Sequence, residues 1–219
     1  MVLCIALWAF LYSDNTTKPN VYSHIKQLTQ SDENDLFPIF SPDGEYLVFS
    51  RNMDFCQSHI WAKHLASGQE FQLTKQAANY GRASFSKDGG ELAVALQKAC
   101  LKQVENDLTV EQQKKSQQCW SIQTMDFAQA INGQTDMVER YQCSENPIEL
   151  VYALDNNRYS FLSFQDNRYQ LAVWDGRRSK LASFHQQIDK RIYFYAFHGA
   201  SQRFAVISRD KDNLSLIHI

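Results

Sequence analysis

Short apolar runs that alternate with polar residues follow one another along most of the chain, each bounded by turn-forming residues. Four such segments align with one another: Phe40–Ser50, Phe85–Leu96, Ala153–Ser163 and Phe197–Ser208. Each begins with an apolar residue, continues with a turn rich in Gly, Asn, Asp or Ser, and ends in a strand-like run. Alternation of this kind is typical of β-strands, and pairs such as Asp43-Gly44 tolerate the positive φ of tight turns. The pattern therefore predicts a series of β-hairpins.

The hairpins recur at a nearly constant interval. Phe40 and Phe85 are 45 residues apart, and Ala153 and Phe197 are 44 residues apart. The middle interval, from Phe85 to Ala153, is 68 residues, and it becomes regular if residues 100–119 are an insertion. A period near 45 residues predicts an all-β fold, a β-propeller with one four-stranded antiparallel blade per repeat.

The other strands fall where this period requires them. We expect third and fourth strands at His59–Leu65 and Glu70–Thr74, at Trp120–Phe127 and Met137–Tyr141, and at Tyr169–Asp175 and Ser179–Phe184. Gly68, Gly133 and Gly176 mark the turns between them. The predicted propeller covers 24–219, with blades at about 24–74, 75–141, 142–184 and 185–219. The last blade ends after two strands, so about three and a half blades are present and the ring is incomplete.

An uninterrupted apolar run occupies the N-terminal end. Residues 1–12 are too short to cross a bilayer, which needs about 20 residues, and the first basic residue is Lys18. Three interpretations remain open: the second half of a truncated transmembrane helix, a degenerate signal peptide, or a buried strand. The polar stretch 13–23 is typical of a linker that leaves a membrane, and it favours the first two.

The C-terminal end has two interpretations. Residues Leu214–Ile219 resemble the translation of a sequencing-library transposon end, and we expect them not to be protein sequence. The alternative is a genuine strand, because Leu214, Leu216 and Ile219 suit one.

Composition excludes several function classes. The formal net charge is −2 and the basic residues are scattered, so this segment is not expected to bind nucleic acid. The sequence contains no G-x-S-x-G, HExxH or phosphate-binding glycine-rich motif, and no CxxC pair. We therefore expect no catalytic residues, no cofactor and no metal site.

Three acidic residues and two histidines are candidate metal ligands. Asp32, Glu33 and Asp35 fail the EF-hand pattern because Leu36 occupies a ligand position, and we expect them in a solvated loop. His59 and His64 are five residues apart on one predicted strand, so they face opposite sides and cannot share a metal.

The cysteines predict a disulfide at the base of the insertion. Cys100 and Cys119 end one strand and begin the next, where an antiparallel pair brings Cβ atoms close enough to bond. Cys56 and Cys143 form a second, weaker candidate pair, and Cys4 in the apolar run is expected to stay unpaired. The alternative for Cys100 and Cys119 is two buried free thiols.

The segment Ile25–Thr74 resembles the TolB-like, or PD40, propeller repeat. The matching residues are Leu28-Thr29, Pro38, Phe40, Ser41-Pro42-Asp43-Gly44, Leu47-Val48-Phe49-Ser50 and Leu73-Thr74. The second repeat keeps Ser86, Asp88 and Gly89 but has Lys87 in place of proline. The third and fourth repeats keep only the hairpin pattern. The resemblance implies a propeller that binds partners rather than one that catalyses.

An apolar run, a polar linker and a propeller in this order are similar to CadC/ToxR-like membrane regulators. The similarity implies a single-pass inner-membrane protein, anchored through residues 1–12, with a periplasmic sensor that binds an envelope protein or a small-molecule signal. DNA would be bound only by a winged helix that this sequence does not contain. The alternatives are a periplasmic TolB-like scaffold and the propeller of a serine peptidase whose catalytic domain lies beyond Ile219.

Overall fold

The structure is a computed structural model of the chain. It describes residues 25–54, 57–97, 119–154, 157–181, 191–199, 201–210 and 213–218. The chain divides into two units, Met1–Ser31 and Asp32–Ile219, and all the strands lie in the second. The predictions for residues 1–12, for Cys4 and for most of the insertion lie outside the described residues.

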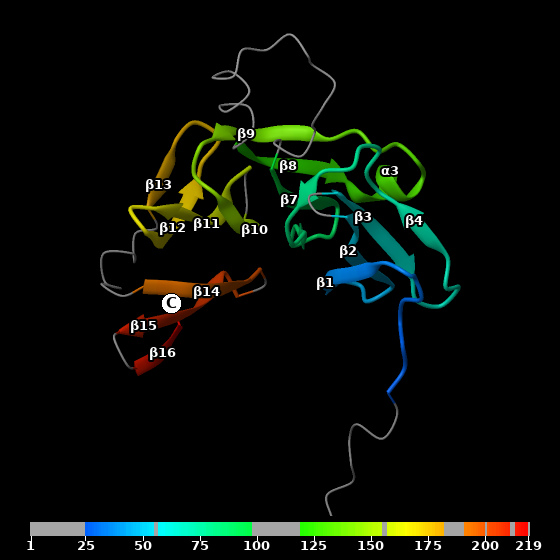
Figure 1. The fold of residues 1–219 in the computed structure, drawn as a ribbon, viewed down its shortest axis with the longest axis horizontal. Coiled ribbons are helices and arrows are strands. Elements are labelled where there is room, and N and C mark those ends of the chain that lie inside the picture. Colours follow the sequence, from blue (N-terminus) through cyan, green and yellow to red (C-terminus); the bar gives the residue numbers. More distant parts are fainter. Residues whose placement is uncertain are drawn as a thin grey trace, which may run out of the picture. The chain divides into compact units, whose positions relative to one another are not determined.

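The second unit consists of four consecutive antiparallel sheets (Figure 1). The first sheet contains β1 (Asn34–Phe40), β2 (Tyr46–Asp54), β3 (Gln57–His64) and β4 (Glu70–Gln72). The second contains β5 (Asn79–Tyr80), β6 (Ser84–Phe85), β7 (Glu91–Gln97), β8 (Trp120–Asp126) and β9 (Val138–Ser144). The third contains β10 (Ile148–Ala153), β11 (Tyr159–Gln165), β12 (Arg168–Trp174) and β13 (Ser179–Leu181). The fourth contains β14 (Arg191–His198), β15 (Arg203–Asp210) and β16 (Asn213–His218).

The antiparallel hairpins that the repeat predicts are confirmed. The prediction that the fourth blade ends after two strands is wrong. The fourth sheet has a third strand, β16, which pairs with β15 from Asp210↔Asn213 to Ala205↔His218. Backbone pairing of this length is available because β15 offers a free edge. Strand β16 covers Leu214–His218 of the C-terminal segment that has two interpretations, and the expectation that Leu214–Ile219 are not protein sequence stays a prediction.

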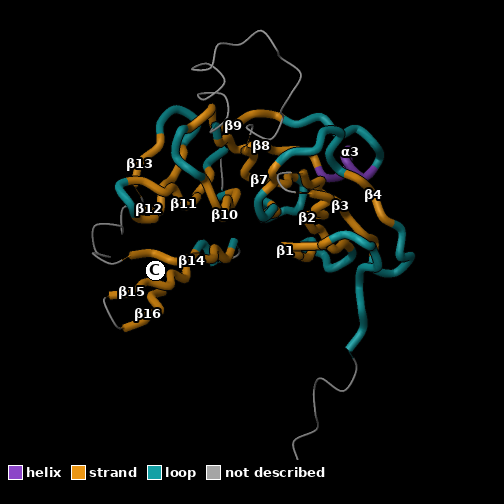
Figure 2. The backbone as a smooth tube through the Cα atoms, in the orientation of Figure 1, coloured by secondary structure: helices purple, strands orange, loops and turns teal. Residues whose placement is uncertain are grey.

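One short helix is present in the described part of the chain, between β8 and β9 (Figure 2). Helix α3 spans Phe127–Ile131, so the predicted strand ends one residue early. The carboxylate of Asp126 accepts a hydrogen bond from the amide of Gln129 at 2.8 Å, which caps the helix. Phe127 packs edge-on against Tyr46 and Phe85, with ring centroids 5.3 and 4.9 Å away.

Neighbouring sheets pack face to face through apolar side chains. In β7, Leu92, Val94 and Leu96 belong to the cluster shared with the first sheet. Ala93 and Ala95, on the opposite face, belong to the cluster shared with the third sheet. A strand buried on both faces in this way must be apolar throughout its buried part, and in β7 the five buried residues Leu92–Leu96 are all apolar.

The small residues of β7 face large ones. Ala93 and Ala95 pack in the same cluster as the fully buried rings of Tyr159 and Phe161. A third cluster joins the third and fourth sheets through Leu162, Leu171, Ile192, Tyr195 and Val206. Large rings opposite alanines keep the sheets at a constant separation while filling the space between them.

The Ser-x-Asp-Gly turns of the first two sheets use the same hydrogen bonds. The hydroxyl of Ser41 donates to Asp43, and it accepts from the amide of Tyr46 at 2.9 Å. In the second turn Ser86 donates to Asp88 at 2.6 Å, and it accepts from the amide of Glu91 at 2.9 Å. These bonds lower the pKa of Asp43 and Asp88. The residue between Ser and Asp donates no bond here, so Lys87 replaces proline without changing the turn.

The two turn glycines offer a matched stability test. Gly44 and Gly89 have φ of +74° and +77°, so alanine is strained at both, by about 1 kcal/mol. A Cβ atom on Gly44 would meet nothing within 4 Å, whereas one on Gly89 would lie 3.3 Å from Cδ of Pro42. Urea unfolding should therefore show a larger loss of stability for Gly89→Ala than for Gly44→Ala. Equal losses, or the opposite order, would contradict the packing of the two turns.

Candidate binding site on the inner strands

The first strand of each sheet lies on the inner side of the sheet series (Figure 1), and it is irregular at a corresponding place. The pairing register shifts between Leu36 and Ile39 in β1, between Glu149 and Tyr152 in β10, and between Ile192 and Phe194 in β14. In the second sheet the inner strand is divided into β5 and β6. Bulges re-aim side chains, so these positions leave the ordinary alternation of the sheet.

The repeat aligns these irregular positions. Three residues before each hairpin-opening residue stand Phe37, Arg82, Leu150 and Phe194. Phe37 and Leu150 have positive φ, 56° and 51°, which is uncommon for large side chains. Backbone strain of this kind collects at functional sites in proteins, and it directs attention to this position of the repeat.

Arg82 is the one charged residue at this repeat position. Its guanidinium carbon lies 5.8 Å from the ring centroid of Phe37 on β1 and 5.8 Å from that of Phe194 on β14. Its Nε atom is buried and has no hydrogen-bond partner. We call Phe37, Arg82, Tyr152 and Phe194 the inner-strand cluster, to which each of the four sheets contributes one residue.

The pKa of Tyr152 depends on the charge of Arg82. Burial raises the pKa of the Tyr152 phenol, and the nearby charge of Arg82 opposes that rise. Tyr152 also packs edge-on against Tyr195, with ring centroids 5.1 Å apart. The hydroxyl of Tyr195 donates to the carbonyl of Leu150 at 2.7 Å, which fixes the strained segment of β10.

Arg51 is the opposite case, and it corrects the prediction for the acidic residues. Asp35 does not lie in a solvated loop: it is in β1, directly across from Arg51 on β2. Arg51 donates to both carboxylate oxygens of Asp35, at 2.8 and 3.1 Å, and to Glu70 at 3.0 Å. Glu33 lies farther away, at 3.8 Å. The hydrogen bond that Arg51 donates to Asp35 is the main cause that raises the pKa of Arg51, and the pair is structural.

The histidines also have structural roles. His59 and His64 face opposite sides of β3, as predicted: His59 is buried and its Nδ1 lies 3.1 Å from the carbonyl of Thr74, while His64 contacts Ser67 in a turn. Burial lowers the pKa of His59. His198 contacts Ser201 in the same way as His64 contacts Ser67, with an Nδ1 to Oγ distance of 2.8 Å.

A concavity lies between the hairpin turns of the second and third sheets. It has a volume of about 460 Å³. Its lining consists of Ser86, Lys87, Asp88, Glu91, Ala153, Leu154, Asn157, Arg158 and Tyr159. Both acids in it accept hydrogen bonds: Glu91 from the Tyr159 hydroxyl at 2.8 Å and from Arg140 at 3.0 Å, and Asp88 from the Ser86 hydroxyl at 2.6 Å. Burial, followed by the bond to Glu91, raises the pKa of Tyr159. The bond from Tyr159 on β11 to Glu91 on β7 ties the second and third sheets together.

Neither a metal-ligand group nor a membrane-spanning helix is found among the described residues. In the described ranges, no group of three or more His, Cys, Asp or Glu side chains could hold a metal ion. In the same part of the chain, no helix combines the length and apolar character needed to cross a membrane.

The cysteine predictions are tested only in part. Cys119 is buried and disulfide-bonded. Cys100 and Cys56 lie outside the described residues, so the Cys100–Cys119 and Cys56–Cys143 pairings stay predictions. Cys143 belongs to β9, the strand next to β8, where Ser144 lies opposite Trp120.

Comparison with known proteins supports the fold. No protein-family model matches the chain, and no curated protein sequence matches it. Among solved structures, TolB from Acinetobacter baumannii is similar, with 14% identity over 90% of this chain and 43% of that one, and a TM-score of 0.61. A puromycin-hydrolyzing peptidase from Mycobacterium tuberculosis has 14% identity over 85% of this chain and 28% of that one, with a TM-score of 0.57. An oligogalacturonate lyase from Vibrio parahaemolyticus has 12% identity over 88% and 51%, with a TM-score of 0.57.

These similarities identify a TolB-like β-propeller fold. The chain spans less than two thirds of the length of each of these three proteins. A TolB, a peptidase and a lyase share this fold, so the fold alone does not assign an activity to this chain.

The sequence interpretation missed Arg82, although a signal for it was present. Aligning the four repeats places a single charged residue among Phe37, Leu150 and Phe194. What the alignment does not show is that these residues converge, because that depends on how the sheets pack.

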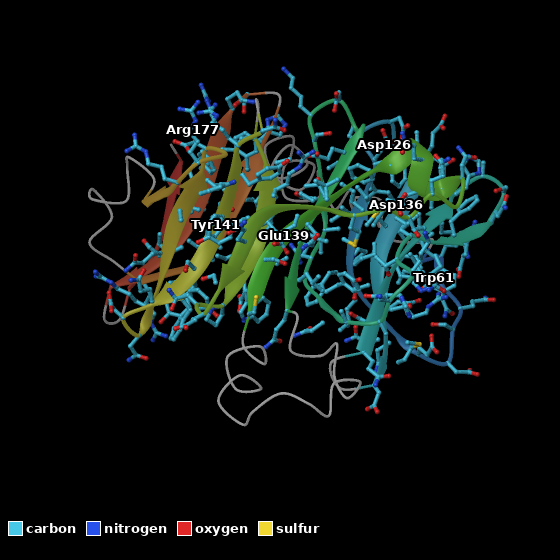
Figure 3. All side chains as sticks on the ribbon, turned by 90° about the horizontal axis from the view of Figure 1, so that it is seen from above. Trp61, Asp126, Asp136, Glu139, Tyr141 and Arg177 are labelled. Carbon is cyan, nitrogen blue, oxygen red and sulfur yellow. The ribbon has the colours of Figure 1, made fainter. Side chains whose placement is uncertain are left out.

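Replacing Arg51 should destabilise the protein, because the carboxylates of Asp35 and Glu70 lose the positive charge with which they form ion pairs. Arg51→Ala leaves the Asp35 carboxylate, whose side chain is 10% exposed, without its partner. We expect the free energy of unfolding to fall by about 3 kcal/mol in urea titrations. Arg177, exposed on the turn between β12 and β13 (Figure 3), is the matched control, and Arg177→Ala should change stability by less than about 0.5 kcal/mol. Similar effects of the two substitutions would show that the Arg51 ion pairs contribute little.

Peptide mapping without reduction tests the disulfide. We expect a peptide that joins Cys100 to Cys119 in protein exported from the cytoplasm. Recovery of Cys119 linked to Cys143, or of Cys119 as a freely alkylated thiol, would contradict the pairing.

Proposed function

We propose that this chain is a non-catalytic binding propeller, the periplasmic sensor of a membrane-anchored winged-helix regulator. The observation that carries the proposal is the inner-strand cluster, in which Arg82 stands between two aromatic rings. Such a group is suited to recognition, because a guanidinium stays charged at all working pH values and does not exchange protons with a substrate. The signal would be an envelope protein or a small molecule.

The geometry favours binding over catalysis. The carboxylates of Asp35, Glu70 and Glu91 each form ion pairs with arginines, and His59 is buried against Thr74. Groups engaged in this way stabilise sheets. General acid–base work instead needs a titratable group within reach of a substrate proton.

The membrane context of the proposal comes from the sequence. The apolar run at residues 1–12, followed by the polar linker 13–23, supports a propeller attached to the outer side of an inner membrane. DNA binding belongs in this proposal to a winged helix encoded upstream. This segment itself contributes neither a basic surface nor a positive net charge, since the formal charge is −2.

Two other functions are compatible with the same fold. The similarity to TolB supports a periplasmic scaffold that binds other envelope proteins. The similarity to the mycobacterial peptidase supports a propeller attached to a hydrolase. The three functions differ in what flanks the propeller: a winged helix upstream, a cleavable signal, or a serine hydrolase downstream.

Recovering the flanking coding sequence and testing the topology of its product decides between them. We expect an upstream winged helix, and a full-length protein whose C-terminal alkaline phosphatase fusion is active, because that enzyme needs an oxidising compartment. A matching β-galactosidase fusion, expected to be inactive, is the control. A winged helix with an inactive phosphatase fusion would contradict the periplasmic sensor. A cleaved signal or a downstream hydrolase would replace the regulator with one of the alternatives.

A further inference from the structure

The charge of Arg82 lacks the compensation that the other interior arginines have. Arg51 pairs with Asp35 and Glu70, and Arg140 pairs with Glu91. Among the described residues, no carboxylate forms an ion pair with Arg82, although its Nε atom is buried. A partly buried charge without a counter-ion is costly, and a buried polar atom without a partner calls for an explanation such as a bound ion.

The surroundings of Arg82 define what kind of ion fits. Phe37 and Phe194 flank the guanidinium from opposite sheets, and Phe37 remains 42% exposed. Tyr152 is near enough for the charge of Arg82 to lower the pKa of its phenol, and its hydroxyl lies 3.5 Å from the carbonyl oxygen of Tyr195. The cluster therefore offers one planar cation, one hydroxyl and two apolar rings.

We propose that the inner-strand cluster binds the carboxylate of an apolar organic acid, with Arg82 as the anion-binding group and Phe37 and Phe194 as the walls that contact its apolar part. A planar carboxylate matches the planar donors of a guanidinium, and a single arginine balances a single negative charge. A phosphate dianion would require a second cation, and the contacts of the cluster include none.

This inference rests on the proposed function and names the ligand class of that sensor. The carboxylate can come from a free acid or from the C-terminus of a peptide, and both present the same planar anion beside an apolar group. The two sources are separated by the probes. Binding to the cluster is also independent of the membrane topology, so the two proposals fail separately.

Binding is tested by calorimetry or by NMR titration with benzoate. Benzamide has the same shape without the charge, and inorganic phosphate has charge without the apolar group. A short peptide ending in phenylalanine is used with a free and with an amidated C-terminus. We expect benzoate, the free peptide or both to bind, and benzamide, phosphate and the amidated peptide not to bind detectably.

Substitutions assign the binding to the cluster. Arg82→Gln is expected to weaken binding at least about tenfold, since hydrogen bonds to charged groups contribute at least about 1.4 kcal/mol. Arg82→Lys, which keeps the charge and the packing of the stem, should weaken it about fivefold because the planar pair of donors is lost. Arg177→Gln makes the same change of charge as Arg82→Gln on an exposed turn, and should bind as the unaltered protein does.

The folded state of each variant is checked through Tyr152. In Arg82→Gln, the pKa of Tyr152, followed by ¹³C-tyrosine NMR and assigned with Tyr152→Phe, should rise, because a positive charge that lowered it is gone. Undiminished benzoate binding by Arg82→Gln or Arg82→Lys would overturn the proposal. So would equal binding of benzamide or phosphate, or no binding of either carboxylate probe by the unaltered protein.

Discussion

Face-to-face packing of sheets is the constraint on which the rest of this structure depends. β7 shows it most clearly, with Leu92, Val94 and Leu96 in one interface and Ala93 and Ala95 in the next. Because both faces of a sheet are buried, polar groups that do not pair within a sheet must lie at strand ends, in turns or on inner strands. Side chains that could bind a ligand are therefore expected at those same places in this fold.

A comparison of Arg51 with Arg82 illustrates the consequence. Arg51 lies within a sheet, and the strand next to it supplies Asp35 at the directly opposite position. Arg82 lies between β5 and β6, where the ladder is interrupted, and its neighbours come from other sheets. The charge of Arg51, within the sheet, is neutralised by Asp35, the residue directly opposite it on the neighbouring strand. A charge at an interruption has rings for neighbours and stays available to a ligand.

The sequence was sufficient for features set by local chemistry. The Ser-x-Asp-Gly turns were predictable because Ser41 and Asp43 form their bonds within six residues, and the period placed three of the blades. Features that need distant partners were not predictable. Asp35 looked like part of a solvated acidic loop because Arg51, sixteen residues away, is not visible as its partner in a linear pattern. Arg82 was missed for the same reason, since Phe37 and Phe194 meet it only after the sheets have packed.

The central claim is that Arg82 is a cation held by aromatic rings and that no carboxylate of the described residues pairs with it. A crystal structure of the full-length protein tests it most directly. We predict the Arg82 guanidinium between the rings of Phe37 and Phe194, with every carboxylate of the protein beyond the ion-pair distance of about 4 Å. An aspartate or glutamate of the same protein paired with Arg82 would contradict the account, because the charge would then be structural in the way that of Arg51 is.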